Sequence, residues 1–576
     1  MAQSVELIPE ETEAAPPQAS ARPAATDTSW RERARSVDRT TVVALALLFA
    51  LGLGLRVANL GGVGFAEDEI NKLEAVRAYA RGDITPNAEH PMLMKTLVFA
   101  SVRAAEGWNA RGRAGDTLGA LDISDEAAVR SPNALFGALT VLPLFLLTQS
   151  FFGRRTGLVA AALWAAGVNA VTYNRTAKED PLRVFFMLSA FDFYVRAKQT
   201  SGFEPGRKRK FYAGGAVSFG LMFASKYFPH YFGLNMLYHH LVAQRRREPG
   251  EPPGRTPLFF YPLVFAAFLA ANPAILLPET WNYIGTYSSE QLLTHHGYLF
   301  AGRLYPNTVS STPFGTPFYF YLLFLAVKVP LPVVAAMIVG LVLCARRWRE
   351  PGPAFLLLMF VLWIVPYSIF GAKWLRYTLS LMPLVYMLAA VGVAWLVGRA
   401  SRLANDRVIL SRDGARGAGS TFPARAAAAV VLLVFVAWPA WSAYASRPHY
   451  ALYTNALAAG RAGHFFPHDE FYDDRLREAI RFVAERAPRG ATVVHETPGV
   501  ARYYLEKFGR TDLQSRALSD PQFSVEGAPR PAYYLLQRGR TYFENREKMD
   551  AVRARFPKVH EELIGGASAV EVYEAR

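Results

Sequence analysis

The chain has 576 residues, which is long for one soluble domain, and 52 % of them are hydrophobic while only 19 % are charged. Soluble proteins carry about 25 % charged residues, so this composition excludes a disordered or fibrous chain and favours a very large core or a membrane protein. The net charge of +16 suits nucleic-acid binding only if the basic residues share one surface. The chain has one cysteine, which excludes an intramolecular disulfide.

Apolar stretches long enough to cross a bilayer, which takes about 20 helical residues, recur along the chain. The stretch at 156–174 is apolar around the whole helix, as expected in lipid. The stretch at 317–345 contains Lys328, Pro330 and Pro332, which predict a bend or break. We count eleven stretches, at approximately 40–60, 133–152, 156–174, 181–197, 211–226, 228–243, 257–278, 317–345, 354–371, 376–398 and 425–444.

Basic residues in the connections predict the orientation of the chain. They cluster on alternate connections, and short basic loops stay in the cytoplasm. We therefore expect a multi-pass protein with a cytoplasmic N-terminus and its C-terminal part outside, and no nucleic-acid partner. Residues 1–38 are expected to be a disordered cytoplasmic tail. The clusters are Arg31, Arg33, Arg35 and Arg39; Arg154 and Arg155; Arg207, Lys208, Arg209 and Lys210; Arg245, Arg246 and Arg247; Arg346, Arg347 and Arg349; and Arg399, Arg402, Arg407, Arg412 and Arg416.

Three regions follow from this pattern: a cytoplasmic tail, a transmembrane core at 39–444 and an outside domain at 445–576. The core has a long first outside loop at 61–132, in which the apolar run beginning at His90 is expected to lie in the membrane interface. In the outside domain, helical patterns alternate with the strand-like runs ATVVHE, PAYYLLQ and SAVEVYE, which predict a small α/β domain. Since this domain lacks cysteine, a bacterial envelope and hence the inner membrane is favoured.

Acidic residues at the expected outer membrane edge are the first candidates for chemistry. Glu67, Asp68 and Glu69 follow the first stretch, and a carboxylate there can accept a proton or bind a divalent metal. The alternative is a solvated acidic loop. Asp180 lies in the short loop NRTAKEDP, where it is either functional or a helix N-cap.

Basic residues at the same edge break the positive-inside pattern. Arginine and lysine there can hold a phosphate or pyrophosphate at the outer leaflet, although isolated cases can also be snorkelling side chains. The candidates are Arg175, Lys226, Arg303, Lys373 and Arg376, with Lys178 beside Arg175.

Glu89 and His90 form a further candidate pair for metal or substrate binding, and His295 and His296 are another. The alternatives are a helix start at Pro91 and a surface histidine pair. Whether a metal is bound stays open. The sequence has no P-loop, dinucleotide-binding, HExxH or GxSxG motif, so we expect a substrate that arrives already activated.

In their order along the chain, the Asp-Glu after the first stretch, the Glu-His-Pro segment, the short Arg…Asp-Pro loop, PFYFYLLFLAVKVPLP and KWLRY resemble the GT-C glycosyltransferases. The similarity covers roughly 40–400 and is to the branch of the protein O-mannosyltransferases and the lipid A aminoarabinose transferases. It implies a GT-C-like fold and transfer of a sugar from a polyprenyl-phosphate donor on the periplasmic side.

Carried onto this sequence, the resemblance makes Asp68 the base with Glu69 as its neighbour, and Asp180 the acid of the second outside loop. Lys226 and Arg376 match residues that hold the donor phosphate. Glu89 matches a metal-binding glutamate whose distant partner is His295 or His296, while His90 stands where the aminoarabinose branch has lysine. Metal is not required across the family.

The expected reaction is an inverting transfer of a hexosyl or pentosyl group to lipid A, a protein or a polysaccharide. Asp68 would deprotonate the acceptor, and basic residues would stabilise the leaving lipid phosphate. Two alternatives remain from sequence: a transporter or flippase of lipid-linked glycans, and an assembly protein that binds glycan through 445–576.

Overall fold

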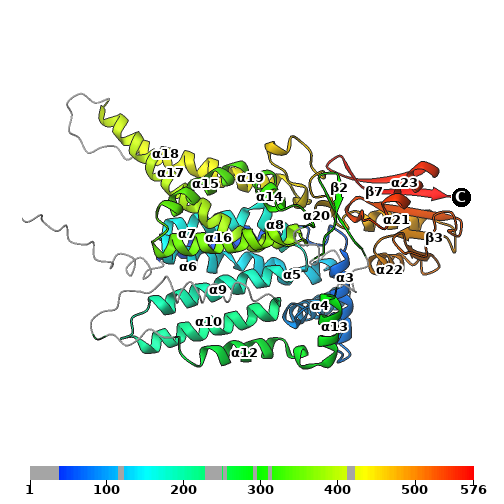
Figure 1. Cartoon of the computed structure of the whole chain (residues 1–576), viewed down its shortest axis with the longest axis horizontal. Coiled ribbons are helices and arrows are strands. Elements are labelled where there is room, and N and C mark those ends of the chain that lie inside the picture. Colours follow the sequence, from blue (N-terminus) through cyan, green and yellow to red (C-terminus); the bar gives the residue numbers. More distant parts are fainter. Residues whose placement is uncertain are drawn as a thin grey trace, which may run out of the picture.

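The computed structural model describes residues 38–113, 122–227, 250, 256–289, 295–308, 314–410 and 422–576. A bundle of long helices makes up most of the molecule, and an α/β domain lies at one end of it (Figure 1). The expected tail at 1–38, apart from its last residue, and the expected crossing at 228–243 lie outside the described residues.

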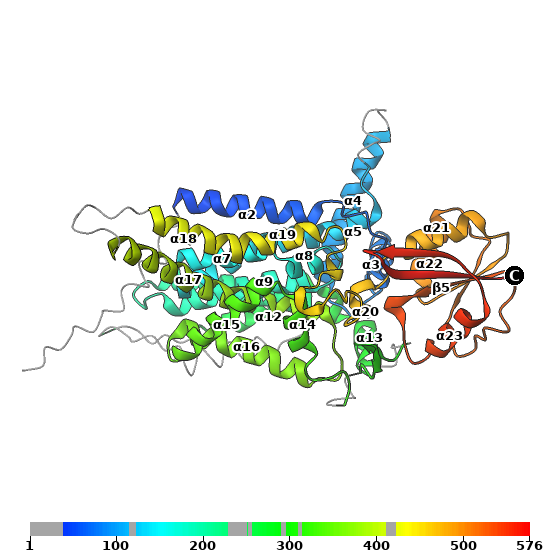
Figure 2. The same cartoon turned by 90° about the horizontal axis from the view of Figure 1, so that it is seen from above.

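Most helices of the bundle run approximately along the long axis of the molecule (Figures 1 and 2). Among the described residues, five helices are long and apolar enough to cross a membrane, or six if one bent pair counts as a span. The expected number of eleven membrane crossings stays a prediction. The bundle contains α2 (Arg39–Val57), α5 (Asp125–Leu139), α6 (Val141–Phe152), α7 (Arg154–Ala166), α8 (Val168–Asn174), α9 (Asp180–Gln199), α10 (Pro205–Ser225), α12 (Phe260–Ala271), α14 (Phe320–Lys328), α15 (Leu331–Arg346), α16 (Pro351–Ile369), α17 (Met382–Leu410), α18 (Phe422–Leu432), the π-helical turn η5 (Leu433–Ala437) and α19 (Trp438–Ala445).

Breaks in these helices have local causes. The expected break near Pro330 is confirmed, because α14 ends at Lys328 and α15 begins at Leu331. The stretch at 156–174 was expected to be one helix, but α7 and α8 are bent by 54° at Gly167. The Tyr386 hydroxyl packs where a Cβ at Gly167 would lie, so glycine allows this close approach.

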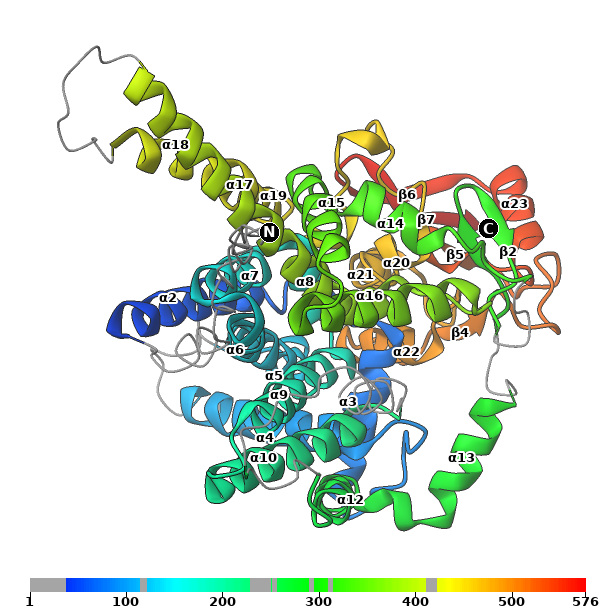
Figure 3. The ribbon, with the colours of Figure 1, turned by 60° about the vertical axis from the view of Figure 1, so that its left-hand side comes forward.

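Contacts at the helix ends show which connections share one end of the bundle. Arg154 at the start of α7 pairs with Asp38 before α2, with an N–O distance of 2.7 Å. At the other end of α2, the Tyr450 hydroxyl donates to the Leu55 carbonyl at 3.2 Å. The α/β domain lies at this second end (Figure 2). This arrangement agrees with the alternating charge pattern, while the assignment of the ends to cytoplasm and periplasm stays a prediction. Figure 3 shows that α17 and α18 extend together beyond the other helices.

Further elements lie near the end of the bundle that faces the α/β domain (Figure 1). Helix α4 lies crosswise to the bundle axis in Figure 2, the geometry expected of an interfacial helix rather than a crossing. These elements are α3 (Glu67–Tyr79), α4 (Met92–Arg113), η2 (Pro273–Leu276), α13 (Pro278–Ser288), the hairpin of β1 (Tyr298–Phe300) and β2 (Arg303–Tyr305), and η4 (Leu375–Ser380).

The α/β domain is built on a five-stranded sheet of order β4-β3-β5-β7-β6. Strands β3, β4 and β5 are parallel, and the last two strands pair antiparallel. The expected alternation of strands and helices is therefore present. The elements are α21 (Leu476–Arg486), β3 (Thr492–His495), α22 (Pro498–Lys507), β4 (Gln514–Ala517), β5 (Ala532–Gln537), η8 (Arg538–Arg540), α23 (Arg546–Arg555), β6 (Lys558–Ile564) and β7 (Ala567–Ala575).

The segment between α19 and α21 returns to the bundle before the α/β domain begins. It contains η6 (Tyr450–Leu452), η7 (Ala456–Ala458) and α20 (Pro467–Phe471). The Asn455 amide donates to the carbonyls of Ala326 and Val329, both at 2.7 Å. Glu470 pairs with Lys328 at 2.7 Å, and both side chains are buried. This segment, predicted to belong to the outside domain, thus contacts the helix bundle, and its last part also contacts the α/β domain through the pair of Asp473 with Arg540.

Candidate functional site

A cavity of about 150 Å³ lies at the end of the bundle that faces the α/β domain. Its walls come from the loop and helix after α2, from α5, from the end of α8 with the loop before α9, from η4, and from the segment at 448–474. Its charged lining residues are Glu69, Arg130, Arg175, Lys178, Asp180, Arg376, Asp469, Glu470, Asp473 and Asp474.

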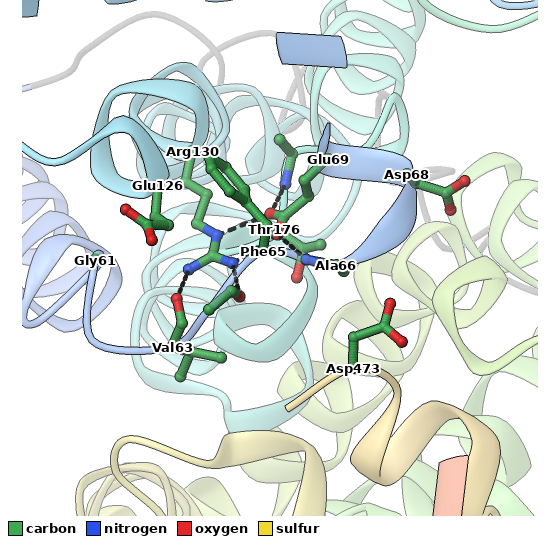
Figure 4. Close-up of polar contacts among 12 residues, drawn as sticks. Gly61, Val63, Phe65, Ala66, Asp68, Glu69, Glu126, Arg130, Thr176 and Asp473 are labelled. Carbon is green, nitrogen blue, oxygen red and sulfur yellow. Dashed lines mark hydrogen bonds and ion pairs between the residues drawn. The ribbon is translucent and has the colours of Figure 1, made fainter. Parts of the chain in front are cut away.

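Two neighbouring acids of helix α3, Asp68 and Glu69, point in different directions. Glu67, Asp68 and Glu69 occupy its first turn, where carboxylates complement the helix dipole. Figure 4 shows Glu69 directed toward Arg130 and Asp68 directed away from it. Glu69 is fully buried and accepts from Arg130, from the Ala177 backbone N–H at 2.8 Å and from the Ala66 backbone N–H at 3.0 Å. Both carboxylate oxygens of Glu69 are therefore engaged in joining α3 to α5 and to the loop before α9.

Asp68 is the meeting point of three segments. Its Oδ2 forms an ion pair with Lys178 and lies 3.5 Å from Nη1 of Arg376. The Tyr472 hydroxyl donates to the same oxygen at 3.0 Å. The side chain keeps 29 % exposure, so Asp68 borders accessible space while its charge is matched by two cations.

A second acid–cation pair lies beside the first. Lys226 Nζ lies 2.8 Å from Oδ1 of Asp180, and Arg183 lies 4.0 Å from the same oxygen. The other oxygen of Asp180 is buried without a hydrogen-bond partner in the described structure. Glu179, rather than Asp180, occupies the N-cap position of α9. An orphaned buried carboxylate oxygen that borders a cavity is available for a substrate group.

The loop before α9 is held by charges on both sides. Lys72 of α3 pairs with Glu179 at 2.8 Å, with both side chains almost completely buried. Burial alone would raise the pKa of Glu179, but Lys72, His90 and Lys178 outweigh it and hold this pKa well below its usual range. Burial, assisted by Arg376, holds the pKa of Lys178 well below its usual range. A bound anion would therefore strengthen the protonated form of Lys178.

The other predicted phosphate-binding cations are either bound to backbone carbonyls or lie outside the cavity. Arg175 lines the cavity, but its guanidinium donates to the carbonyls of Leu55, Arg56, Ala58 and Asn59 at the end of α2. Lys373 is buried and donates to the Thr316 carbonyl at 2.6 Å, and it does not line this cavity. Arg303 is exposed on β2 over the Tyr305 ring, also outside the cavity. The cations that the structure brings together are thus Lys178, Lys226 and Arg376.

The predicted metal ligands are spread over two places. The Glu89 carboxylate accepts from the Asn87 amide at 2.6 Å, and burial lowers the pKa of the neighbouring His90 to about 4. His295 stacks on Tyr542 with ring centroids 4.5 Å apart, while His296 contacts Glu544 at 2.6 Å. Within the described residues, no three histidine, cysteine, aspartate or glutamate side chains gather as metal ligands. Binding of a divalent metal stays a prediction.

Sequence reasoning missed the segment after the last span. Asp469, Tyr472, Asp473 and Asp474 of this segment line the cavity. Asp473 pairs with Arg540 of the α/β domain and accepts from the Glu67 backbone N–H at 2.8 Å. The sequence signal was the acid-rich run PHDEFYDDR soon after an apolar stretch.

Two segments of the chain match known protein families. Residues 119–276 match the family of dolichyl-phosphate-mannose-protein mannosyltransferases, and residues 307–446 match the Alg9-like mannosyltransferase family. No curated protein matches the chain significantly in sequence.

Three solved structures are similar to all or part of the chain. ArnT from Cupriavidus metallidurans bound to undecaprenyl phosphate is 12 % identical with a TM-score of 0.47, over 95 % of this chain and 98 % of that one. The Archaeoglobus fulgidus oligosaccharyltransferase is 12 % identical with a TM-score of 0.48, over 82 % of this chain and 64 % of that one. The S. cerevisiae protein O-mannosyltransferase Pmt1–Pmt2 complex bound to the sugar donor is 17 % identical with a TM-score of 0.30, over 47 % and 37 %. Each of the two family models covers less than half of the chain and both describe mannosyltransferases, so in these two segments the chain is similar to mannosyltransferase families.

Proposed function

We propose that this protein transfers a sugar from a polyprenyl-phosphate carrier to an envelope acceptor at the periplasmic face of a bacterial inner membrane. The observation that supports this most is the convergence of Lys178, Lys226 and Arg376 with Asp68 and Asp180 at one cavity end of the bundle. These residues come from four separate segments, and a solvated surface would not bury them together.

The two kinds of charge have different tasks in this reaction. Arginine and lysine bind phosphate strongly, arginine through two parallel hydrogen bonds. In the free protein Lys178 and Arg376 contact Asp68. The phosphate of the carrier would replace Asp68 as the partner of these two cations. The same cations would stabilise the negative charge that develops on the phosphate as it leaves.

The transfer itself is an inverting displacement. The acceptor hydroxyl or amine attacks the anomeric carbon, and the bond from that carbon to the phosphate oxygen breaks. Because a phosphate leaving group needs no protonation, one base and a cationic site are sufficient. On the family resemblance Asp68 is the base. The sugar is a hexose or a pentose, and the acceptor is lipid A, a protein or a polysaccharide.

The test is sugar transfer in membranes that contain the full chain, given labelled polyprenyl-phosphate hexoses and pentoses. Asp68→Asn should lower transfer by roughly 10²–10⁴ if Asp68 is the base. The matched control is Asp83→Asn, because Asp83 is an exposed acid of the same loop whose hydrogen bonds are to Thr85. Full transfer by Asp68→Asn would remove Asp68 from the reaction. Sugar moved across the membrane with the carrier bond intact would favour a transporter instead.

A further inference from the structure

We propose that Arg540 of the α/β domain is a positioning residue for Asp68, so that this domain completes the site of sugar transfer. The inference rests on the proposed function, in which Asp68 is the base. It assigns the α/β domain a task in the reaction, although Arg540 itself is not among the described residues that line the cavity.

The helix that carries Asp68 does not cap its own first turn. Ala66 occupies the N-cap position of α3, and alanine has no side-chain oxygen that could accept from the backbone N–H groups at a helix start. The carboxylate of Asp473 accepts from the Glu67 backbone N–H at 2.8 Å instead. Figure 4 shows Asp473 directed toward this turn. The cap thus comes from a residue that lies 406 positions later in the chain.

Arg540 holds Asp473 in this place. Its Nε donates to Oδ1 of Asp473 at 2.7 Å, and its Nη2 donates to Oδ2. Its Nη1 lies 2.8 Å from Oε2 of Glu67. Arg540 and Asp473 are both buried. An arginine fork fixes the direction of a carboxylate as well as its distance, which the single ammonium group of a lysine does not. Arg540 therefore orients both the cap of α3 and the residue before Asp68.

Tyr472 continues this connection to Asp68 itself. The Arg540 guanidinium lies over the Tyr472 ring, 4.5 Å from its centroid, and the Tyr472 hydroxyl donates to Oδ2 of Asp68 at 3.0 Å. The backbone φ of Tyr472 is 46°, which a residue with a side chain adopts only where its surroundings hold it. Gly539 permits this close packing, because a Cβ there would lie 2.6 Å from the Tyr472 carbonyl oxygen.

The α/β domain also holds the loop that leads into α3. The Tyr504 hydroxyl of α22 accepts from the Phe65 backbone N–H at 2.7 Å, and Nη1 of Arg477 on α21 donates to the Gly61 carbonyl at 3.1 Å. A Cβ at Gly64 would lie 2.8 Å from the Cβ of Arg477, so the loop and the domain are in direct contact. The α/β domain thus holds both the entry to α3 and its first turn.

A positioning role differs measurably from a contact that only stabilises the fold. If Arg540 acts through Asp68, its loss lowers the rate of the transfer step and leaves donor binding, which depends on Lys178, Lys226 and Arg376, nearly unchanged. Misplacing a catalytic group by about 1 Å can lower a rate about 10²-fold. Because residues that act as a unit have non-additive effects, the loss should also vanish once the Asp68 carboxylate is gone.

The experiment measures sugar transfer by the full chain in membranes, given labelled polyprenyl-phosphate hexoses and pentoses with bacterial envelope as acceptor source. Arg540→Lys keeps the charge but loses the fork, and should lower kcat about 10- to 100-fold with the donor KM within about threefold. In the Asp68→Asn background the same substitution should change kcat by less than about threefold. The control is Arg510→Lys, because Arg510 binds Asp512 and backbone carbonyls within the α/β domain, and it should leave both constants unchanged.

Tyr472→Phe tests the contact with Asp68 without changing a charge. It should lower kcat about three- to tenfold, the effect of one lost hydrogen bond. The matched control is Tyr534→Phe, which removes a hydroxyl that donates to the Val525 carbonyl inside the α/β domain and should leave kcat unchanged. The melting temperature shows whether each variant folds.

Wild-type kcat in folded Arg540→Lys overturns this inference and leaves the proposed function standing. If Arg540→Lys does not fold, wild-type kcat in Tyr472→Phe overturns it in the same way. An equal loss from Arg540→Lys with and without Asp68→Asn also overturns it, because Arg540 would then act independently of Asp68. Wild-type protein that transfers none of the labelled sugars overturns the proposed function itself, and this inference with it.

Discussion

The two ends of the helix bundle use charge in opposite ways. At the end that carries Asp38, the pair of Arg154 with Asp38 is exposed, and its side chains keep 44 % and 46 % exposure. At the cavity end, Lys72 and Glu179 keep 1 % and 5 %. Buried charges lose hydration and are tolerated only with well-placed partners, while exposed pairs contribute little.

This difference distinguishes charges that indicate only the orientation of the chain from charges that build a functional site. The exposed pair at the first end can rearrange freely in water. The buried pairs at the cavity end join residues far apart in sequence, such as Glu69 with Arg130 and Asp473 with Arg540. Such pairs fix the positions of Asp68, Lys178 and Arg376 before a substrate arrives, which is what electrostatic catalysis requires.

The largest effect is expected from Arg130→Met, because it leaves the fully buried Glu69 carboxylate without a counter-charge. Breaking a buried pair in this way costs about 3–5 kcal/mol. The melting temperature of the detergent-solubilised protein should fall strongly. The double variant Arg130→Met, Glu69→Gln should recover part of that loss. A single variant as stable as the wild type would contradict the view that Glu69 is held by Arg130.

The next effect concerns donor binding. Lys178→Gln removes a cation from the cavity and should weaken binding of the polyprenyl-phosphate donor about 10- to 100-fold, since a hydrogen bond to a charged group contributes about 1.5–3 kcal/mol. Donor KM or photocrosslinking measures it. The control is Arg303→Gln, because Arg303 is exposed and lies outside the cavity. Equal weakening by both variants would show that the cavity does not select among the outer cations.

A smaller effect should appear on acidification. Burial, assisted by Arg540, lowers the pKa of His295 to about 4, so the folded state binds fewer protons there than the unfolded state, in which a histidine has a pKa near 6.5. Above pH 6.5 the free energy of unfolding is therefore unaffected by the protonation of His295. As the pH falls toward 4 the free energy of unfolding decreases, by about 1 kcal/mol at pH 5.5. His295→Asn should therefore show a shallower fall of melting temperature between pH 7 and 5.5. Identical slopes would contradict this assignment.

Much of the architecture could be predicted from the sequence because it follows from composition. Hydropathy predicted several of the long apolar helices, Pro330 marked the helix break, and alternating runs indicated the α/β domain. The bend at Gly167 depends on Tyr386, which is more than 200 residues away, so no local pattern could reveal it.

The candidate site was harder to predict from sequence, because its contacts also join residues that are far apart in the chain. The order of motifs pointed to Asp68, Asp180, Lys226 and Arg376, which the structure brings to one end of the bundle. The resemblance ended near residue 400 and left out the acids at 469–474, whose place depends on the return of the chain to the core. Sequence also could not tell Arg303, exposed on a hairpin, from Arg376 at the cavity.

The smallest effect is expected from Arg347→Gln at the end of the bundle remote from the cavity. Arg347 pairs with Glu350 three residues later, and both side chains are largely exposed. Exposed pairs contribute about 0.2–1 kcal/mol, so the melting temperature should barely change and sugar transfer should equal that of the wild type. A large loss of transfer would mean that the charges at this end take part in the reaction, and the contrast between the two ends would then no longer separate topology from chemistry.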